Sequence, residues 1–432
     1  MNQNKMATNF AATNFAATIG LDWADKKHDL WIQPSDGGKP EHRVIEQTPQ
    51  ALHEWVAQMR ARFPKGRIAI ALETSRGAVI SALGAYDFIV LFPINPAMLC
   101  SYRAAFCVSG AKDDRTDAML QEEYLRLHSD KLRPLEPDTE LTRQLAGLVE
   151  NRRGLVDERT GLVNQLHSLV KTYYPLIEVL FADMTLPLAA DFLRQWPDLA
   201  SVQKAGPATL RKFFYGHNCR CDKIMEERLQ AIAKAQPLTQ DPALIVPAVL
   251  KAQALAGMLQ VLHQSIGQME KIIEQTTDAH PDAAIFRSFP AAGPALAARI
   301  LTAFGTNRNR FASAQEVQQF YGIAPVKKQS GQSKVIAMRH RCPKFGRQTF
   351  HENAGHAVRQ EGWAKRCYEQ QRERKKGHHA SVRAVAFKLM RIYFRCWKDK
   401  KCYDANLYEK ALENHGSPLA GLNKKAARAN GE

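Results

Sequence analysis

A heptad repeat of leucines is the strongest constraint that the sequence places on the fold. Leucines recur every seven residues, and further apolar residues fill the seam between them: Leu141, Leu148, Leu155, Leu162 and Leu169, with Leu145, Leu166 and Tyr173. This spacing predicts one long helix whose apolar stripe faces a partner helix, as in a coiled coil. Arg152 and Arg159 occupy the same seam, where polar residues weaken the pairing or fix its register.

A second apolar seam predicts a second long helix. Its members are spaced alternately by four and three residues: Leu255, Leu259, Leu262, Ile266, Met269 and Ile273. Pairing of the two helices within one chain and pairing between two copies would both bury these seams, and the sequence leaves both open. We expect a coiled-coil region at residues 138–278, with an insertion at 178–245.

Residues 18–130 show a different pattern, in which short apolar runs alternate with amphipathic stretches. The runs predict strands at 18–24, 28–33, 42–47, 67–74 and 89–95. Helices are expected at 50–63, at 77–88 and twice after the last strand. This order predicts an α/β domain, a mixed sheet flanked by helices. A chain of 432 residues has room for more than one domain, and we expect a leader at 1–17, a second, mainly helical domain at 283–405 and a tail at 406–432.

The charge of the chain indicates a polyanionic partner. Lysines and arginines number 60 against 43 aspartates and glutamates, a net charge of +17. The densest basic run lies between residues 308 and 347, and seven of its members are expected to contact nucleic acid: Lys327, Lys328, Lys334, Arg339, Arg341, Lys344 and Arg347. Residues 286–305 resemble a helix-hairpin-helix element, which presents backbone amides to phosphate.

No segment of the sequence predicts export or a membrane partner. The N-terminus lacks a basic region followed by an apolar core, and no apolar run approaches the roughly 18 to 20 residues of a membrane span. The eight cysteines are scattered through the chain, which favours reduced thiols in a cytoplasm. His217, Cys219 and Cys221 have no second ligand cluster at a usable spacing, so a zinc site is not expected there.

Four acidic residues stand out in this basic chain. Asp22 interrupts the first predicted strand and Glu73 ends the fourth, and a lone carboxylate in a sheet core is costly unless it is paired or bound to metal. Asp114 and Asp117 are three residues apart at a predicted helix start, so they share one face. Capping by Asp113 or Asp114 would also explain acids there. Converging carboxylates predict a site for Mg²⁺, or Mn²⁺, of the kind used in phosphodiester chemistry.

Several motifs resemble the DEDD transposases of the insertion-sequence one-ten family. They are IGLDWADKKHDLWI, ALETSRG, INPAMLCSYRAAFCVSGAKDDRTDA and FPAAG, followed by RFASAQEVQQFYGIAPVKKQSGQS. The resemblance implies an N-terminal RuvC-like domain with an RNase H-like fold, joined by a coiled coil to a C-terminal transposase domain. It carries the family's four catalytic and metal-binding acids onto Asp22, Glu73, Asp114 and Asp117. FPAAG stands where the family usually has the glycine-rich IPGIG, and residues 178–245 have no counterpart.

The resemblance also implies a function. It implies a site-specific recombinase that mobilises its own insertion sequence, with Ser330, rather than Ser333, as a catalytic serine. The implied partners are double-stranded donor and target DNA, a structured guide RNA encoded by the element, and further copies of the chain in a dimer or tetramer. The implied location is the prokaryotic cytoplasm, at the nucleoid.

Two other functions remain open on the sequence. One is a RuvC-like endonuclease that resolves branched DNA without a serine nucleophile, and the other is a non-catalytic scaffold that binds nucleic acid. A serine hydroxyl needs an activating group, and no carboxylate or histidine lies near Ser330 in the sequence. We therefore expect the metal site of the four acids, in a neighbouring protomer, to activate it.

Overall fold

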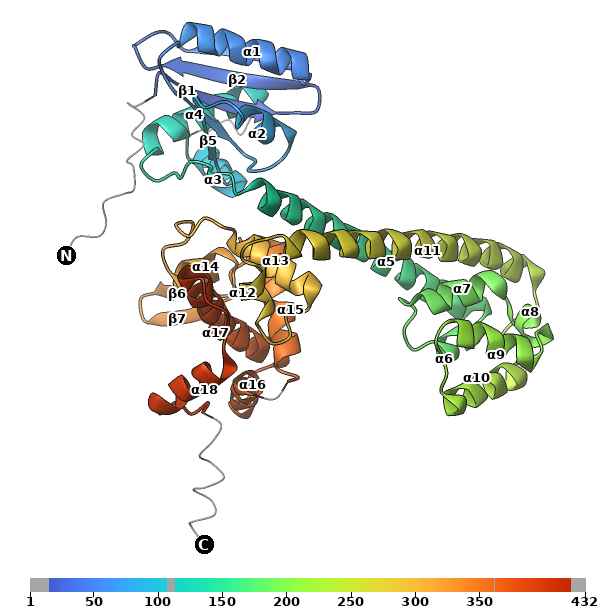
Figure 1. Ribbon diagram of the computed structural model, residues 1–432. Coiled ribbons are helices and arrows are strands. Elements are labelled where there is room, and N and C mark those ends of the chain that lie inside the picture. The colour runs from blue at the N-terminus through green and yellow to red at the C-terminus, as the bar shows by residue number, and fades with distance from the viewer. Residues whose placement is uncertain (1–14, 107–112, 361, 421–432) are drawn as a thin grey trace. The chain divides into compact units, whose positions relative to one another are not determined.

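The computed structural model describes residues 15–106, 113–360 and 362–420. The chain divides into two compact units, residues 1–137 and 138–432 (Figure 1). Most of the expected leader, residues 1–14, lies outside the described residues. An α/β sheet forms the first unit, and helices make up most of the second.

The first unit contains a five-stranded mixed sheet. Its strands are β1 (Ala17–Trp23), β2 (Lys27–Pro34), β3 (Glu41–Glu46), β4 (Ile68–Leu72) and β5 (Ile89–Pro93), in the order β3-β2-β1-β4-β5. β1, β2 and β3 pair antiparallel, whereas β1, β4 and β5 pair parallel. The helices are α1 (Pro49–Arg62), α2 (Ala78–Leu83), α3 (Pro96–Phe106) and α4 (Asp114–His128). These elements lie where the sequence pattern predicts them.

The two faces of this sheet carry different side chains. Large residues such as Ile19, Leu21 and Ile70 pack into a core shared with α1 and α2. Because side chains alternate along a strand, Gly20 and Ala71 turn to the other face, where α4 packs. A Cβ atom at Gly20 would lie 1.8 Å from the carbonyl oxygen of Ala118 in α4. These small residues therefore allow the helix to approach the sheet closely.

Two long helices, α5 (Glu140–Tyr173) and α11 (Pro242–Asp278), pack along each other in the second unit. Val163, Leu166 and Leu259 are buried in the core at one end of this pair. Of the two open arrangements, the structure thus has the pairing within one chain. The five heptad leucines of α5 are only half-buried. The face of α5 that is fully buried lies beside the leucine stripe and not directly on it.

Five shorter helices connect α5 to α11: α6 (Leu176–Leu180), α7 (Pro187–Gln195), α8 (Leu199–Lys204), α9 (Pro207–Gly216) and α10 (Asp222–Lys234). Phe181, Phe192 and Phe214 are fully or almost fully buried in their common core, which also includes the adjoining ends of α5 and α11. The insertion expected at 178–245 is therefore a small helical bundle.

The remainder of the second unit is built around one buried helix. Its elements are α12 (Ala283–Arg287), α13 (Pro294–Phe304), α14 (Ala314–Phe320), β6 (Val326–Ser330), β7 (Ser333–Ala337), α15 (Lys344–Ala357), α16 (Trp363–Glu373), α17 (His378–Asp399) and α18 (Ala405–Asn414). Tyr393 and Trp397 of α17 are fully buried among aromatic rings that include Phe304. The segment expected as a tail begins with α18, where Glu409 pairs with Arg366.

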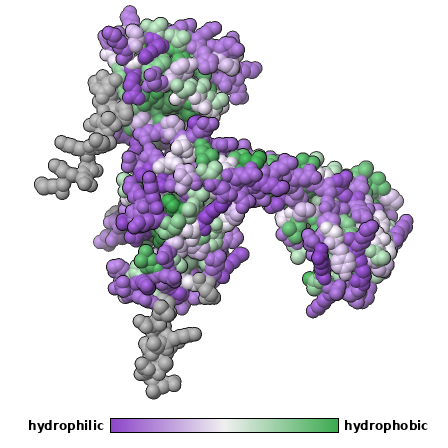
Figure 2. Space-filling model, viewed as in Figure 1, coloured by the Kyte–Doolittle hydropathy of each residue, from purple (hydrophilic) through white to green (hydrophobic). Residues whose placement is uncertain are grey.

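Helix α11 is, within the described residues, the one helix long and apolar enough to cross a membrane by length and composition, with a mean hydropathy of 1.6 over an 18-residue stretch. It packs against α5 and α7, and the buried residues of one face belong to the core of the second unit. Apolar side chains also remain exposed along it, among them Leu250, Val261 and Ile272. Figure 2 shows apolar surface along this helix. Core helices of proteins outside membranes have the same composition, so this helix is weak evidence of a span.

Candidate active site

The face of the sheet covered by α4 carries the first of the four acids. Every second residue of β1 points to this face, and these residues are Thr18, Gly20 and Asp22. The Thr18 hydroxyl donates to the Glu122 carboxylate of α4 at 2.6 Å, and Gly20 lies against Ala118 one turn earlier in the helix. Each step of two residues along β1 thus moves about one turn toward the start of α4, so Asp22 lies beside the first turn of that helix.

The other three acids come from the end of β4 and the start of α4. Glu73 directly follows β4, and Asp114 and Asp117 lie in the first turn of α4. The Asp113 side chain is the N-cap of this helix and accepts hydrogen bonds from the backbone N–H groups of Arg115 and Thr116 at 3.0 and 3.3 Å. Capping is therefore carried out by Asp113, which leaves the carboxylates of Asp114 and Asp117 for other contacts.

Electrostatic coupling shows that these acids lie together. Burial, and after it the nearby carboxylates of Asp117, Asp114, Glu73 and Asp29 in that order of effect, raises the pKa of Asp22 to about 6. Both effects disfavour the charged form of Asp22, which a nearby cation would favour.

Two cationic side chains form ion pairs with three of these acids. The Lys27 ammonium lies 3.2 Å from an oxygen of Asp29 and 3.7 Å from one of Asp114. The Arg103 guanidinium of α3 pairs with the buried Asp117. Among the residues that the structure describes, no three histidine, cysteine, aspartate or glutamate side chains form a ready-made metal site. The four carboxylates share one region without surrounding a single point.

Asp29 is a residue of this site that the sequence reasoning missed. It lies directly opposite Asp22 in the antiparallel ladder of β1 and β2, it is buried, and His42 contacts its second oxygen at 2.7 Å. The signal was present in the sequence, since a short turn between two adjacent strands makes residues 22 and 29 cross-strand neighbours.

Ser330 lies at the tip of a hairpin formed by β6 and β7 in the second unit. It pairs with Ser333 across a two-residue turn, and Gly331 has a φ of 54°, which glycine adopts readily in such turns. Both serines are exposed. The four acids belong to the first unit, so the predicted site residues fall into two groups on different units.

The lysines of this hairpin divide between its two faces. Lys328 pairs with Val335, two residues from the Ser330 pair, so it shares the face of Ser330. Lys327 and Lys334 each lie at a neighbouring position of the ladder, so they share the opposite face. All three lysines are exposed.

The remaining predicted contacts follow the hairpin. Arg341 and Lys344 are exposed, whereas Arg339 and Arg347 are half-buried. The Arg347 guanidinium donates a hydrogen bond of 3.2 Å to the Arg339 carbonyl. Residues 283–432 contain 29 lysines and arginines against 10 aspartates and glutamates. That net charge of +19 exceeds the +17 of the whole chain, so residues 1–282 carry no excess positive charge.

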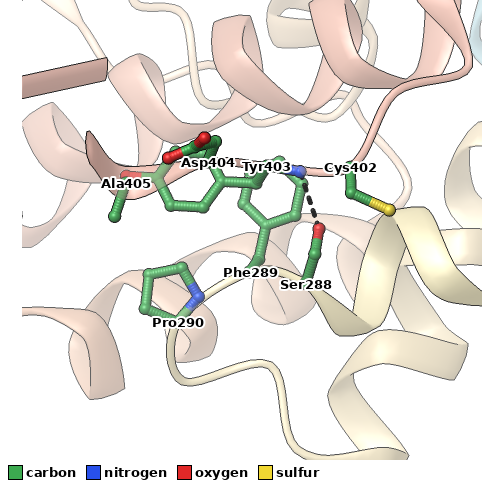
Figure 3. Close-up of a pocket in the computed structure, with 7 residues that line it drawn as sticks. All are labelled: Ser288, Phe289, Pro290, Cys402, Tyr403, Asp404 and Ala405. Carbon is green, nitrogen blue, oxygen red and sulfur yellow. Dashed lines mark hydrogen bonds between the residues drawn. The ribbon is translucent and has the colours of Figure 1, made fainter. Parts of the chain in front are cut away.

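Two other features lie apart from these groups. Both ring nitrogens of His217 are engaged, one by Asp191 at 2.9 Å and one by the Phe213 carbonyl at 3.0 Å, which leaves no nitrogen for a metal. A hollow of about 670 Å³ is lined by Ser288, Phe289, Pro290, Cys402, Tyr403, Asp404 and Ala405 (Figure 3). It contains none of the predicted site residues.

Comparison with known proteins gives the family. A DEDD transposase model, described as "Transposase", matches residues 19–175, and a model of the "Transposase IS116/IS110/IS902 family" matches residues 283–369. The "Mini-circle putative transposase for IS117" of Streptomyces coelicolor is 28% identical over 397 residues, which cover 89% of this chain and 94% of that protein.

A second relative, the "Insertion element IS900 uncharacterized 42 kDa protein" of Mycobacterium paratuberculosis, is 24% identical over 89% of this chain and 96% of its own length. The first family model covers the four acids and the second covers Ser330. The similarity thus spans both units. The chain belongs to the IS110 family of transposases, enzymes that act on DNA.

Proposed function

We propose that this transposase mobilises its insertion sequence by metal-dependent strand cleavage at Asp22, Glu73, Asp114 and Asp117, followed by strand exchange through Ser330. The observation that carries the proposal is the gathering of these four acids where the ends of β1 and β4 meet the first turn of α4, with the pKa of Asp22 raised to about 6. The strand order of the first unit also fits an RNase H-like fold of the RuvC type.

The donor set suits a hard divalent cation, Mg²⁺ or Mn²⁺. All four groups are carboxylates, which such ions prefer, and a bound cation would offset both the burial and the neighbouring negative charge that raise the pKa of Asp22. Asp22, Glu73, Asp114 and Asp117 would hold the ion, and Asp114 and Asp117 would then give up their contacts with Lys27 and Arg103. When bound, the cation stabilises negative charge on the oxygens of the reacting phosphodiester.

The second unit supplies the nucleophile and most of the phosphate contacts. In the exchange step the Ser330 oxygen forms a bond to phosphorus, the bond from phosphorus to one deoxyribose oxygen breaks, and that oxygen takes up the serine's proton. Lys328, on the face of Ser330, neutralises the attacked phosphate. We propose that the acids and the serine come from different protomers of a dimer or tetramer.

The substrates are double-stranded donor and target DNA, and a structured RNA from the element guides their choice. The net charge of +19 on residues 283–432 supports nucleic-acid binding by that part of the chain, because phosphate contacts dominate such affinity. The proposed place of action is the prokaryotic cytoplasm, at the nucleoid.

Uncharged isosteres of the acids test the proposal. Each of four variants should lower strand cleavage by more than about 100-fold: Asp22→Asn, Glu73→Gln, Asp114→Asn and Asp117→Asn. A loss of about 100-fold is the upper end of what is found when a residue that only supports a metal ligand is replaced. DNA affinity should stay near that of the unmodified protein, because these groups do not bind phosphate. Cleavage is measured on labelled donor DNA with the guide RNA present, and affinity by fluorescence anisotropy.

Asp113→Ala is the matched control for this series. It removes the helix cap, at a cost of about 1 kcal/mol in stability, and should leave cleavage largely intact. An essential Asp113 together with a dispensable Asp114 would show that the acid pair is assigned one residue out of register.

A further inference from the structure

One buried amide connects three of the elements that carry the acids. Gln121 of α4 has no exposed surface. In the amide orientation that satisfies its surroundings, its nitrogen donates to the Leu21 carbonyl at 2.7 Å and to the Ala71 carbonyl at 3.2 Å. Leu21 belongs to β1 and Ala71 to β4, so a single side chain bridges the helix and both strands.

The bridged carbonyls lie next to two of the acids. Leu21 directly precedes Asp22, and Ala71 lies two residues before Glu73. The paired residues of β1 and β4 end at Gly20 and Ala71. Leu21 lies just beyond this end and Ala71 lies at it, and the Gln121 amide donates to both carbonyls where the two strands part.

The position of Gln121 in its helix completes the arrangement. It follows Asp117 by four residues and Asp114 by seven, so all three project from one face of α4. A change in the distance between α4 and the strand ends would therefore separate Asp117 from both Asp22 and Glu73.

We infer that Gln121 is a positioning residue that sets the spacing of the four carboxylates and hence their affinity for a divalent cation. This inference rests on the proposed metal-binding role of the acids. Gln121 itself is too deeply buried to contact substrate. Its effect is exerted through the backbone that carries Asp22 and Glu73.

The chain offers a matched control for substitution. Gln318 is also buried, and its amide nitrogen donates to the Phe387 carbonyl at 2.6 Å in the second unit. Gln121→Met and Gln318→Met each replace a buried amide by an apolar side chain of similar length. Both are expected to lower the unfolding midpoint, and only Gln121→Met is expected to alter metal binding.

The test measures Mn²⁺ affinity of the full chain without nucleic acid, by isothermal titration calorimetry. Gln121→Met should weaken this affinity about 10- to 100-fold, the range found when support of metal ligands is removed, and Gln318→Met should leave it unchanged. Cleavage by Gln121→Met should recover as Mn²⁺ is raised. If Gln121→Met does not fold, Gln121→Asn, whose shorter arm reaches at most one carbonyl, should show a smaller loss of affinity.

The outcomes separate this inference from the proposed function. Asp22→Asn is measured alongside, and unchanged Mn²⁺ affinity in that variant would refute the acid site itself. Loss of affinity in Asp22→Asn with unchanged affinity in both Gln121 variants would leave the acid site standing and refute the positioning role.

Discussion

Ala291 has a backbone conformation that glycine adopts more easily. Its φ is 60°, in the loop between α12 and α13. Ala291 is the third residue of the FPAAG motif, which stands where the family usually has IPGIG. The Ala291 carbonyl accepts a hydrogen bond of 3.3 Å from the amide of the buried Asn353, which holds the loop in place. An alanine in this conformation costs roughly 1–2 kcal/mol.

Ala291→Gly is therefore expected to stabilise the second unit by about 0.5–1 kcal/mol, after the greater chain entropy of glycine is subtracted. The urea midpoint of unfolding measures the change. Ala292→Gly is the control, because Ala292 has no positive φ and its replacement should destabilise. A lower midpoint for Ala291→Gly would mean that the methyl group contributes more than the strain costs.

At the scale of single residues, the sequence was most informative where a charge interrupts an apolar run. Asp22 and Glu73 are visible in this way because their neighbours are buried strand residues. Lys27 and Arg103 are not, since nothing in the pattern distinguishes these two basic side chains from the many others in the chain. Gln121 was missed because its two partners are backbone carbonyls of distant strands, which only the packed structure brings within reach.

At the scale of elements, the half-buried leucines of α5 leave part of its apolar seam available. α11 also exposes apolar side chains such as Leu250 and Val261. Charges at two seam positions, Leu155→Glu with Leu162→Glu, are expected to give smaller assemblies in multi-angle light scattering, because an exposed apolar stripe favours association with another copy.

Thr160→Glu with Asn164→Glu is the control for that prediction. Both residues are exposed, and they lie on the far side of α5 from the two leucines. An unchanged mass for the leucine variant would show that the seam is satisfied within one chain.

Strong periodicity decided which elements could be predicted. The strands of the first unit and the helices α5 and α11 have long or alternating apolar patterns, and the structure has them at the expected places. The helices of the 178–245 insertion contain between 5 and 13 residues. Segments this short carry too few repeats for a period to be recognised, and their aromatic core forms only when they pack together.

At the scale of the whole molecule, the net positive charge is confined to one part of the chain. Residues 283–432 carry the entire excess, and the acids lie in the other unit. Binding and cleavage should therefore respond to different substitutions. Replacing Lys327, Lys328 and Lys334 by alanine should weaken DNA binding and lower the slope of log affinity against log salt by up to about 3.

Lys39, Lys65 and Lys131 of the first unit are the matched control, since they are also exposed lysines. Their replacement by alanine should leave the salt slope unchanged. Equal effects of the two triple variants would show that both units contact DNA to the same extent. Anisotropy titrations over a series of KCl concentrations give the slopes.

The most direct test of the proposed chemistry is to trap the reaction, denature it and identify the peptide that carries DNA. We expect DNA attached to the peptide containing Ser330 in the unmodified protein and in Ser333→Ala. Ser330→Ala should give neither the adduct nor recombination, and Asp22→Asn should give no adduct because the cleavage site is disabled. Normal recombination by Ser330→Ala would contradict the serine mechanism and favour an endonuclease that uses the four acids alone.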